Sequence, residues 1–309
     1  MNYNLIVILG PTASGKTRMA ARLARETGSE IISADSRQVY RGMDIGTGKD
    51  MGDYIIDGVA VPHHLIDIVD PDYEFNVFEY QKHFFSCFAE MTSRGVIPIM
   101  AGGTGLYIES VLRGYRMLFV PENPHLRKEL DEADMEMMVK KLLDLNPAVH
   151  NTTDLLDRKR LIRAIEIAEH MKIHEGRDNP PAPSIVPLVI GIRWERSVLR
   201  RRITDRLRER LASGMVEEVK RLHASGIVWE KLDYFGLEYR YVGLYLQGKI
   251  RYNDMFQILN TRIHQYAKKQ ETWFRRMEKQ GIEIHWTPGA DYDVMKALLK
   301  RYLIRSLND

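Results

Sequence analysis

The sequence predicts an α/β fold whose core is a parallel sheet flanked by helices, with a small all-helical insertion domain. Three observations support this prediction. Short apolar runs alternate with helical patterns over the first 115 residues, as they do in βα units. Two proline-bearing segments, 121–124 and 180–187, bracket a stretch with helical patterning only, and a further apolar run follows them. We therefore expect residues 1–115 and 185–309 to form the core and residues 116–184 the insertion.

The expected strands are short apolar runs bounded by small or polar residues, at 5–9, 31–34, 96–100 and 188–192. Apolar residues at three- and four-residue intervals, such as Leu126 with Leu130 and Leu161 with Ile165, predict helices. The expected helices are at 17–25, 77–93, 125–145 and 157–172, and the chain beyond residue 192 is expected to be mostly helical.

Each of the first three strands ends in a turn rich in small or polar residues. These turns are residues 10–15, 35–36 and 102–105. In an open parallel sheet, ligands bind beyond the carboxyl ends of the strands. We therefore expect the three turns to converge on one site.

The composition excludes several classes of protein. Of 309 residues, 44% are hydrophobic and 28% charged, which excludes a disordered or fibrous chain. No apolar run approaches the ~18 residues that a membrane span needs, and the N-terminus lacks a signal-peptide pattern. The single cysteine, Cys87, lies in an aromatic stretch that favours packing over catalysis, and one cysteine excludes intramolecular disulfides and thiolate zinc clusters. We expect a soluble cytoplasmic protein with no membrane partner.

The formal net charge of +3 conceals an uneven distribution. Residues 185–309 carry 24 Lys and Arg against 15 Asp and Glu, whereas residues 1–115 carry 10 against 14 and residues 116–184 carry 11 against 13. Basic character confined to one part of the chain suggests a polyanionic partner. Solvated helix faces balanced by intramolecular ion pairs explain the same numbers equally well.

Residues 10–17, GPTASGKT, match the phosphate-binding pattern GxxxxGK[ST] between a predicted strand and a predicted helix. Gly10 and Gly15 let backbone N–H groups face an anion, and the helix N-terminus adds positive potential. Lys16 supplies a charge to the outer phosphate, and the Thr17 hydroxyl suits a Mg²⁺ ion that bridges phosphate oxygens. The sequence therefore predicts a P-loop NTPase-like core that binds a di- or triphosphate, its loop completed by Thr12, Ala13 and Ser14.

The aspartate that P-loop NTPases place at the end of a second apolar strand has one candidate here. Asp35 follows the apolar run 31–34 and leads directly into SRQVY at 36–40. A carboxylate at that strand end would hold Mg²⁺ through water, act as a general base on a substrate facing the phosphates, or cap the next segment. The residues alone leave these three roles open.

Six segments of the chain resemble, in register, those of the tRNA dimethylallyltransferase family. They are GPTASGKT at 10–17, ISADSRQVYRGMDIGTGK at 32–49, VPHHLIDI at 61–68, AGGTGLYI at 101–108, DRKRLIRAIEI at 157–167 and AKKQETWFR at 267–275. The resemblance extends from residue 4 to about residue 286. Motifs in this order are far more specific than the P-loop alone.

The resemblance implies transfer of a dimethylallyl group from dimethylallyl diphosphate to N6 of the adenosine immediately 3′ of the anticodon, position 37, in tRNAs that read codons starting with U. It implies a fold similar to that of small-molecule kinases, in which the P-loop binds a diphosphate leaving group instead of ATP. The implied partners are dimethylallyl diphosphate and the anticodon stem-loop of tRNA, and the implied cofactor is Mg²⁺. A monomer suits a protein that must surround an RNA loop.

Matching the family motifs assigns roles at the reacting centre. Asp35 is implied as the general base for the N6 proton, and Lys16 as a stabiliser of the leaving group. Thr104 is implied to approach the bridging oxygen and the target nucleotide, although a turn hydroxyl bonded to its own backbone is a simpler alternative. Arg202, which shares a helix face with Arg206, is implied to bind the diphosphate, and an arginine-rich surface helix explains it equally well.

The tRNA contacts that the resemblance implies are spread over the chain. The nucleotides around the target are expected to meet Thr104 and the segment formed by Asp35, Ser36, Arg37 and Gln38. Phosphate contacts, which position RNA without reading its sequence, are expected in the insertion at Arg127, Lys159, Arg160 and Arg163. A further tRNA-facing segment, residues 235–240, contributes Tyr239 and Arg240.

Glu238 departs from the family pattern, which has glycine before the Tyr-Arg pair, so either the loop is displaced or Glu238 reads a base amine. The adjacent His63 and His64 are not a metal pair, because neighbouring residues of an extended segment point to opposite faces. The aromatic residues at helical spacing near the C-terminus are more typical of a core than of a base-stacking surface; they are Tyr266, Trp273 and Phe274.

Two other classes of function stay open on the sequence. A small-molecule P-loop kinase, or a prenyltransferase that acts on free adenine nucleotide, would need neither the basic C-terminal third nor the helical insertion. A non-catalytic RNA-binding protein that uses a nucleotide as a switch would not need Asp35 and Thr104 together.

Overall fold

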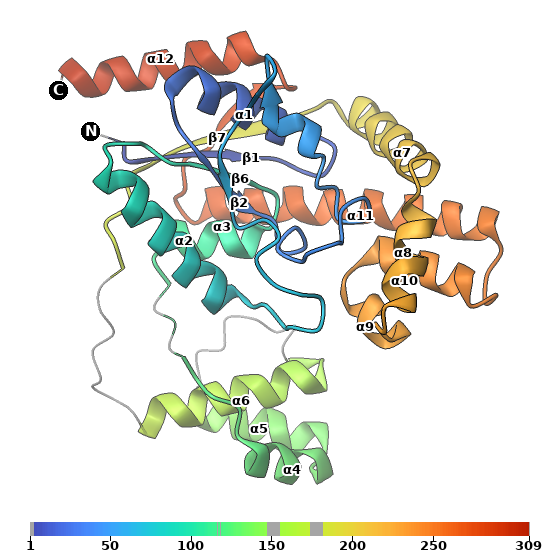
Figure 1. Ribbon diagram of the computed structural model, residues 1–309. Coiled ribbons are helices and arrows are strands. Elements are labelled where there is room, and N and C mark those ends of the chain that lie inside the picture. The colour runs from blue at the N-terminus through green and yellow to red at the C-terminus, as the bar shows by residue number, and fades with distance from the viewer. Residues whose placement is uncertain (1–2, 116, 118, 147–154, 174–181, 309) are drawn as a thin grey trace. The chain divides into compact units, whose positions relative to one another are not determined.

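The computed structural model describes residues 3–115, 117, 119–146, 155–173 and 182–308 (Figure 1). The chain forms two compact units. One, the core unit, consists of Met1–Tyr115 and Ala182–Asp309; the other, the helical unit, is Arg116–Pro181. The second junction lies three residues before the predicted one at 184/185.

The core unit is built on a six-stranded sheet in the order β5-β2-β6-β1-β7-β8, and every pair of neighbouring strands is parallel. In the centre, Val7 of β1 lies opposite Met100 of β6 and Val189 of β7. The strands are β1 (Leu5–Leu9), β2 (Ile31–Ala34), β5 (His63–His64), β6 (Ile99–Gly102), β7 (Pro187–Arg193) and β8 (His285–Pro288). A two-stranded antiparallel hairpin, β3 (Ile55–Ile56) and β4 (Val59–Ala60), precedes β5. The predicted α/β fold is confirmed.

The third strand begins later than the apolar run 96–100 predicts. Gly95 adopts a left-handed conformation with φ 73°, and the Val96 amide donates to the carbonyl oxygen of Met91. These bonds finish the preceding helix, so the ladder of β6 starts only at Ile99. The edge strand β8 was not predicted, because its sequence HWTP has no apolar run.

The core unit's helices begin and end where local signals place them. In α1, Gly15 and Gly28 flank the helix, both with positive φ. In α2, Asn76 and Glu79 form a reciprocal capping box. The helices are α1 (Lys16–Thr27), α2 (Val77–Ser93), α3 (Gly105–Leu112), α7 (Arg196–Ala212), α8 (Met215–Ala224), α9 (Trp229–Tyr234), α10 (Leu237–Leu246), α11 (Tyr252–Lys279) and α12 (Tyr292–Asn308), with a 3-10 turn at Met51–Tyr54.

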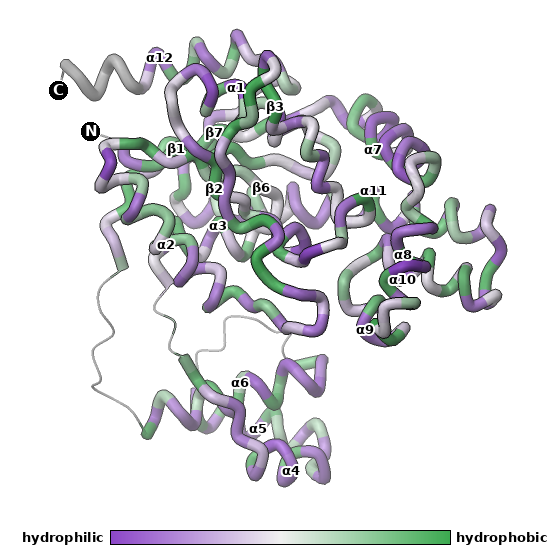
Figure 2. The backbone as a smooth tube through the Cα atoms, in the orientation of Figure 1, coloured by the Kyte–Doolittle hydropathy of each residue, from purple (hydrophilic) through white to green (hydrophobic). Residues whose placement is uncertain are grey.

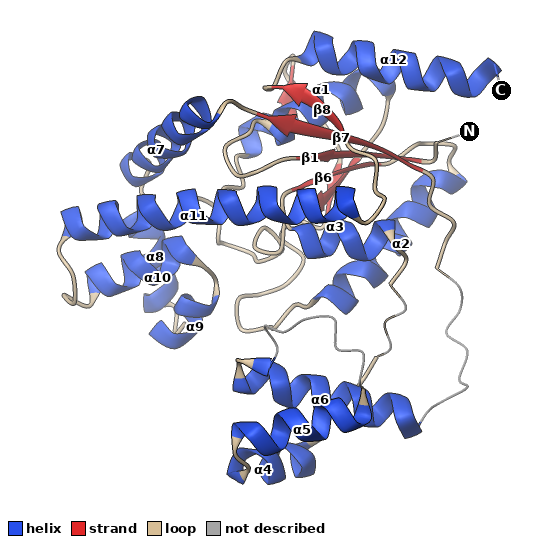
Figure 3. Cartoon of the chain, turned by 180° about the vertical axis from the view of Figure 1, so that it is seen from behind, coloured by secondary structure: helices blue, strands red, loops and turns tan. Residues whose placement is uncertain are grey.

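Helices cover both faces of the sheet (Figures 1 and 3). Ile6 and Ile8 of β1 pack in a cluster with buried residues of α1 and α12. Leu5, Val7 and Leu9 face the other side, where buried residues of α2, α3 and α11 join them. Figure 2 shows the hydrophobic strands inside this arrangement and a largely hydrophilic α7 at its margin. The sheet's carboxyl-end loops therefore sit on a rigid, two-sided core.

The helical unit contains α4 (Pro124–Glu132), α5 (Met135–Leu145) and α6 (Arg158–Ile173). The single helix predicted over 125–145 is wrong, because Asp134 interrupts it and its side chain accepts from the Met137 amide as the cap of α5. Seven buried apolar residues form its core: Leu126, Leu130, Met138, Leu142, Leu161, Ile162 and Ile165.

Candidate active site

The P-loop joins β1 to α1 as the sequence predicts. Its shape depends on close backbone approach: a Cβ added to Gly10 would lie 2.7 Å from the Ser14 hydroxyl, and Gly15 has φ 87°. Ala13 also has positive φ, at 60°. The indole Nε1 of Trp194 donates to the Ser14 carbonyl oxygen at 3.0 Å, which fixes the loop from the β7 side. The N-terminus of α1 therefore faces an open space with its backbone amides.

Lys16 is the first residue of α1, and its ammonium group lies 3.4 Å from the carbonyl oxygen of Pro11. Burial lowers the pKa of Lys16 to about 8; the Asp35 carboxylate opposes this shift, and Arg206 and Arg210 add to it. The Ser14 hydroxyl oxygen is buried and has no hydrogen-bond partner among the described residues. An ammonium group in this environment gains a partner when an anion occupies the loop.

The three strand-end turns converge through hydrogen bonds. The Ser36 amide donates to the Thr104 hydroxyl at 3.1 Å, which links the ends of β2 and β6. Gln270 of α11 links the P-loop, which follows β1, to the turn that follows β6. Its Oε1 accepts from the Thr12 amide at 2.8 Å, and its Nε2 donates to the Gly103 carbonyl oxygen at 2.9 Å. Thr104 is therefore bonded to a neighbouring strand end and not only to its own turn.

Asp35 lies at the end of β2 and lines the same cavity as the P-loop. Its Oδ1 accepts from the Arg37 amide at 2.9 Å, which holds the carboxylate in a local turn. In the part of the chain that the structure describes, Oδ2 has no hydrogen bond or ion pair. One oxygen thus orients the carboxylate, and the other remains available to a ligand.

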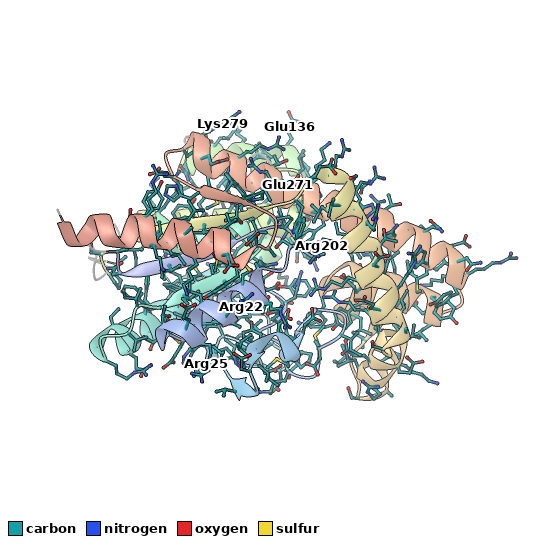
Figure 4. All side chains as sticks on the ribbon, turned by 90° about the horizontal axis from the view of Figure 1, so that it is seen from above. Arg22, Arg25, Glu136, Arg202, Glu271 and Lys279 are labelled. Carbon is teal, nitrogen blue, oxygen red and sulfur yellow. The ribbon has the colours of Figure 1, made fainter. Side chains whose placement is uncertain are left out.

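Helix α7 brings arginines to the P-loop. Arg202 donates from Nε to the Ala13 carbonyl oxygen at 2.9 Å and lies over the Trp194 ring at 4.7 Å; Figure 4 shows it projecting from α7 toward the core. One turn later, Arg206 lies 3.4 Å from the Thr12 hydroxyl and pairs with Asp50. Both guanidinium groups therefore border the anion cradle, as the shared helix face predicts.

The cavity that these groups line has a volume of about 880 Å³, large enough for a nucleobase and a diphosphate together. Its walls come from the P-loop, the β2 turn, the loop 44–50 and the helices α7, α10 and α11. Sequence reasoning gave no role to several of its residues, among them Asp50, Arg210 and Gln270. Gln270 stands inside the motif at 267–275 and Asp50 directly follows the motif at 32–49, so their place at those segments was the available signal.

Comparison with known proteins identifies the family of this site. A family model described as IPP transferase matches residues 38–277, and one described as isopentenyl transferase matches residues 3–56. The chain belongs to the IPP transferase family.

The family's named members are similar over nearly their whole length. The chain is 61% identical to tRNA dimethylallyltransferase 1 of Syntrophus aciditrophicus (strain SB), covering 97% of this chain and 98% of the relative. It is 56% identical to tRNA dimethylallyltransferase 1 of Geotalea uraniireducens (strain Rf4), over 96% of each. The crystal structure of the tRNA isopentenylpyrophosphate transferase of Bacillus halodurans matches with a TM-score of 0.69 and 30% identity, over 99% of this chain and 97% of that one. The protein is therefore an enzyme of the prenyltransferase class, and the predicted family is confirmed.

The residues that the IPP transferase family implies for tRNA fall into two groups in the core unit. Ser36, Arg37 and Gln38 line the cavity beside Asp35, and Arg240 lines its edge, where its guanidinium pairs with Asp233. Tyr239 differs: only 1% of it is exposed, and its hydroxyl donates to Glu218 at 2.8 Å. Glu218 also accepts from the amides of residues 44–46, so Tyr239, which itself lines the cavity, connects that loop to α10 through Glu218.

In the helical unit, Arg127 and Arg163 both bind the buried carboxylate of Glu166, at 2.7 and 2.9 Å. Their side chains stay 35% and 39% exposed although Arg127 also pairs with Glu122 and Arg163 also donates to the Val120 carbonyl oxygen. Lys159 and Arg160 are exposed on α6. The four basic residues thus lie on one small unit, two as parts of its framework.

The structure places Glu238 at the cavity wall. It lies in the first turn of α10, lines the cavity, and faces Arg210 across 3.8 Å. Burial raises the pKa of its carboxyl group, and the Arg210 charge opposes that shift.

The donors near the P-loop suit one kind of metal ion. Thr17 and Asp35 line the cavity, whereas no group of three or more His, Cys, Asp or Glu among the described residues is arranged to hold a metal. Mg²⁺ is commonly held by one or two protein oxygens, substrate phosphates and water. The residues present therefore fit a Mg²⁺ ion that arrives with a phosphate ligand. No described helix is long and apolar enough to cross a membrane.

Proposed function

We propose that the protein transfers a dimethylallyl group from dimethylallyl diphosphate to N6 of the adenosine at position 37 of tRNAs that read codons starting with U. One observation carries this proposal: an anion cradle and a carboxylate, Asp35, line a single cavity that has room for a purine. Membership of the family supports the prenyl-transfer chemistry, and the geometry of the cavity supports the roles given to its residues.

The leaving group is stabilised by positive charge that the fold holds in place. Backbone amides of residues 15–17, the Lys16 ammonium and the Arg202 guanidinium surround the position of the diphosphate. Mg²⁺ at Thr17 would supply further charge to the phosphate oxygens. Because these groups are positioned before the reaction, they stabilise the negative charge that develops as the carbon–oxygen bond breaks.

The acceptor nitrogen attacks the allylic carbon as diphosphate leaves, so one N–C bond forms and one C–O bond breaks. The N6 proton passes to Asp35, whose carboxylate the Arg37 amide orients. The carboxylate accepts this proton because the nitrogen becomes cationic during attack. Thr104, held at 3.1 Å from the Ser36 amide, positions the β2 turn and offers its hydroxyl to the bridging oxygen.

The tRNA is gripped by both units. Single-stranded loop bases are commonly flipped out and stacked when a protein modifies them. Ser36, Arg37, Gln38 and Arg240 border the cavity that would receive the adenine. The exposed basic residues of the helical unit contact the anticodon stem through its phosphates. The proposed enzyme acts in the cytoplasm as a monomer, which suits a protein that must surround an RNA loop.

The test is mass spectrometry of tRNA nucleosides after incubation of purified protein with tRNA, Mg²⁺ and dimethylallyl diphosphate. We expect N6-dimethylallyladenosine in tRNAs with an A-A-A run 3′ of the anticodon, no requirement for ATP, and loss of product with EDTA. Prenylation of AMP at the same efficiency, or phosphorylation of a small molecule with ATP, would replace this proposal with the corresponding small-substrate enzyme. If the tRNA stays unmodified and neither of these small-molecule activities is found, the protein has no catalytic function of the kind proposed.

A further inference from the structure

Arg210 is a buried cation of the cavity to which no role has been assigned. It lies two turns after Arg202 on α7 and lines the cavity, with its side chain only 11% exposed. Its Nε is buried and has no hydrogen-bond partner among the described residues. A guanidinium group presents five N–H donors, and a buried donor without a partner costs about 1–3 kcal/mol.

The neighbours of Arg210 balance its charge without satisfying its donors. Glu238 Oε1 lies 3.8 Å from Nη1, and Asp50 Oδ2 lies 4.0 Å from Nη2, both beyond hydrogen-bond distance. Asp50 is already paired with Arg206. The guanidinium is therefore compensated by two carboxylates at the cavity wall, and neither of them is close enough to accept a hydrogen bond from it.

The position of the guanidinium is fixed by close packing. A Cβ added to Gly48 would lie 1.6 Å from Arg210 Nη2 and 2.8 Å from Arg206 Nη2, so the loop backbone lies directly against both groups. Gly48 itself has φ 70°, which disfavours any larger residue there. The charges of Arg206 and Arg210 both act on Lys16, which places Arg210 within the electrostatic reach of the P-loop.

We infer that Arg210 binds the diphosphate together with Lys16, and that Glu238 is the positioning residue that holds its guanidinium in place while no anion is bound. This inference rests on the proposed diphosphate donor. When diphosphate enters, Arg210 exchanges the distant Glu238 and Asp50 carboxylates for phosphate oxygens at hydrogen-bond distance. When diphosphate leaves, Glu238 competes for the guanidinium and assists release.

The exchange gives Glu238 a reason to stand where the family pattern has glycine. A carboxylate in a diphosphate site weakens anion binding unless a cation lies between them. Here Arg210 lies next to Glu238, so the two residues form a unit: the arginine strengthens binding and the glutamate limits it. Removing one partner therefore has an effect opposite in sign to removing the other.

The test measures the affinity for inorganic diphosphate in the presence of Mg²⁺ by isothermal titration calorimetry, with the full-length protein. Arg210→Met removes the charge and retains an unbranched side chain of similar length. It is expected to raise Kd about tenfold or more, and to raise KM for dimethylallyl diphosphate with little change in kcat. Glu238→Gln is expected to lower Kd severalfold and to slow product release. Arg208→Met, on the same helix but 64% exposed and paired with Asp205, is the matched control and should change neither value.

A double variant, Arg210→Met with Glu238→Gln, separates positioning from direct repulsion. If Glu238 acts through Arg210, the double variant binds diphosphate as Arg210→Met alone does. It also avoids an unpaired buried carboxylate, so the effect on binding is measured without that destabilisation. Arg210→Lys, which retains the charge and loses the fork, should fall between the wild type and Arg210→Met.

Two results would overturn the inference: a Kd for Arg210→Met within twofold of the wild type, or the same tightening by Glu238→Gln with and without Arg210. The first result would show an ion pair that only stabilises the fold, detectable as a lowered Tm with unchanged affinity. The second would show that Glu238 repels the diphosphate directly and does not act through Arg210. These outcomes differ from failure of the proposed function, in which the wild-type protein itself neither binds diphosphate nor prenylates tRNA.

Discussion

Gln270 holds the P-loop and the β6 turn at a fixed separation, and its replacement tests whether that link matters. The amide is 7% exposed and makes two hydrogen bonds, to the Thr12 amide and the Gly103 carbonyl oxygen. Gln270→Ala leaves both backbone groups without this partner. Each loss costs about 1–2 kcal/mol, so the free energy of unfolding should fall by roughly 2–4 kcal/mol.

Gln270→Ala should also lower kcat/KM in the protein that remains folded, because the two turns carry the leaving-group site and Thr104. A misplacement of about 1 Å costs on the order of 100-fold in rate, so we expect kcat/KM to fall about 10- to 100-fold. Gln270→Glu, which keeps the acceptor for Thr12 but sets a carboxylate oxygen against the Gly103 carbonyl, should also be impaired.

Urea unfolding and steady-state kinetics at saturating tRNA measure the two effects. Gln265→Ala is the matched control, since Gln265 is exposed on the same helix and contacts Arg262. If Gln270→Ala unfolds at the same urea concentration as Gln265→Ala and retains full kcat/KM, the reasoning is refuted.

Two further predictions concern titrating groups. Burial lowers the pKa of Lys16 to about 8, and only the charged form of Lys16 binds phosphate. The value of kcat/KM for dimethylallyl diphosphate should therefore be constant below pH 8 and fall up to tenfold per pH unit above it. A pH profile that is flat to pH 10 contradicts this prediction. Burial raises the pKa of Glu166, but hydrogen bonds from Arg127, Arg163 and the Asn123 amide outweigh it and lower the pKa to about 2. These contacts contribute on the order of 3 kcal/mol to the free energy of unfolding above pH 4.5, and this contribution is lost as the pH falls toward 2. Hydrogen-exchange protection of α6 should fall over that range in the wild type. The variant Glu166→Gln should show no such pH dependence.

The P-loop with its flanking elements and helix α2 could be predicted from the sequence, because the residues that form them lie close together in the chain. The P-loop, its strand and its helix follow from an apolar run, two glycines and a lysine that are contiguous in the chain. Helix α2 begins at a capping box formed by Asn76 and Glu79, three residues apart.

The remainder depends on partners that are far apart in the chain. Thr12 and Gln270 are 258 residues apart, and the Tyr239–Glu218 bond hides a ring that its motif suggests is exposed. Arg210 shares its helix with several other arginines, and only the fold shows that it is buried whereas Arg208 is exposed. Periodicity identifies which helix carries the charges, but burial against the loop at Gly48 decides which charges serve the cavity.

The most direct test of the central claim is single-turnover prenyl transfer by Asp35→Asn, measured with saturating tRNA and dimethylallyl diphosphate. If Asp35 accepts the N6 proton in the cavity of the P-loop, the rate constant should fall roughly 100- to 10,000-fold while Kd for tRNA changes little. Asp72→Asn, an exposed loop variant, should leave both values unchanged. Equal losses of rate and tRNA affinity, or an unchanged rate, would contradict the account.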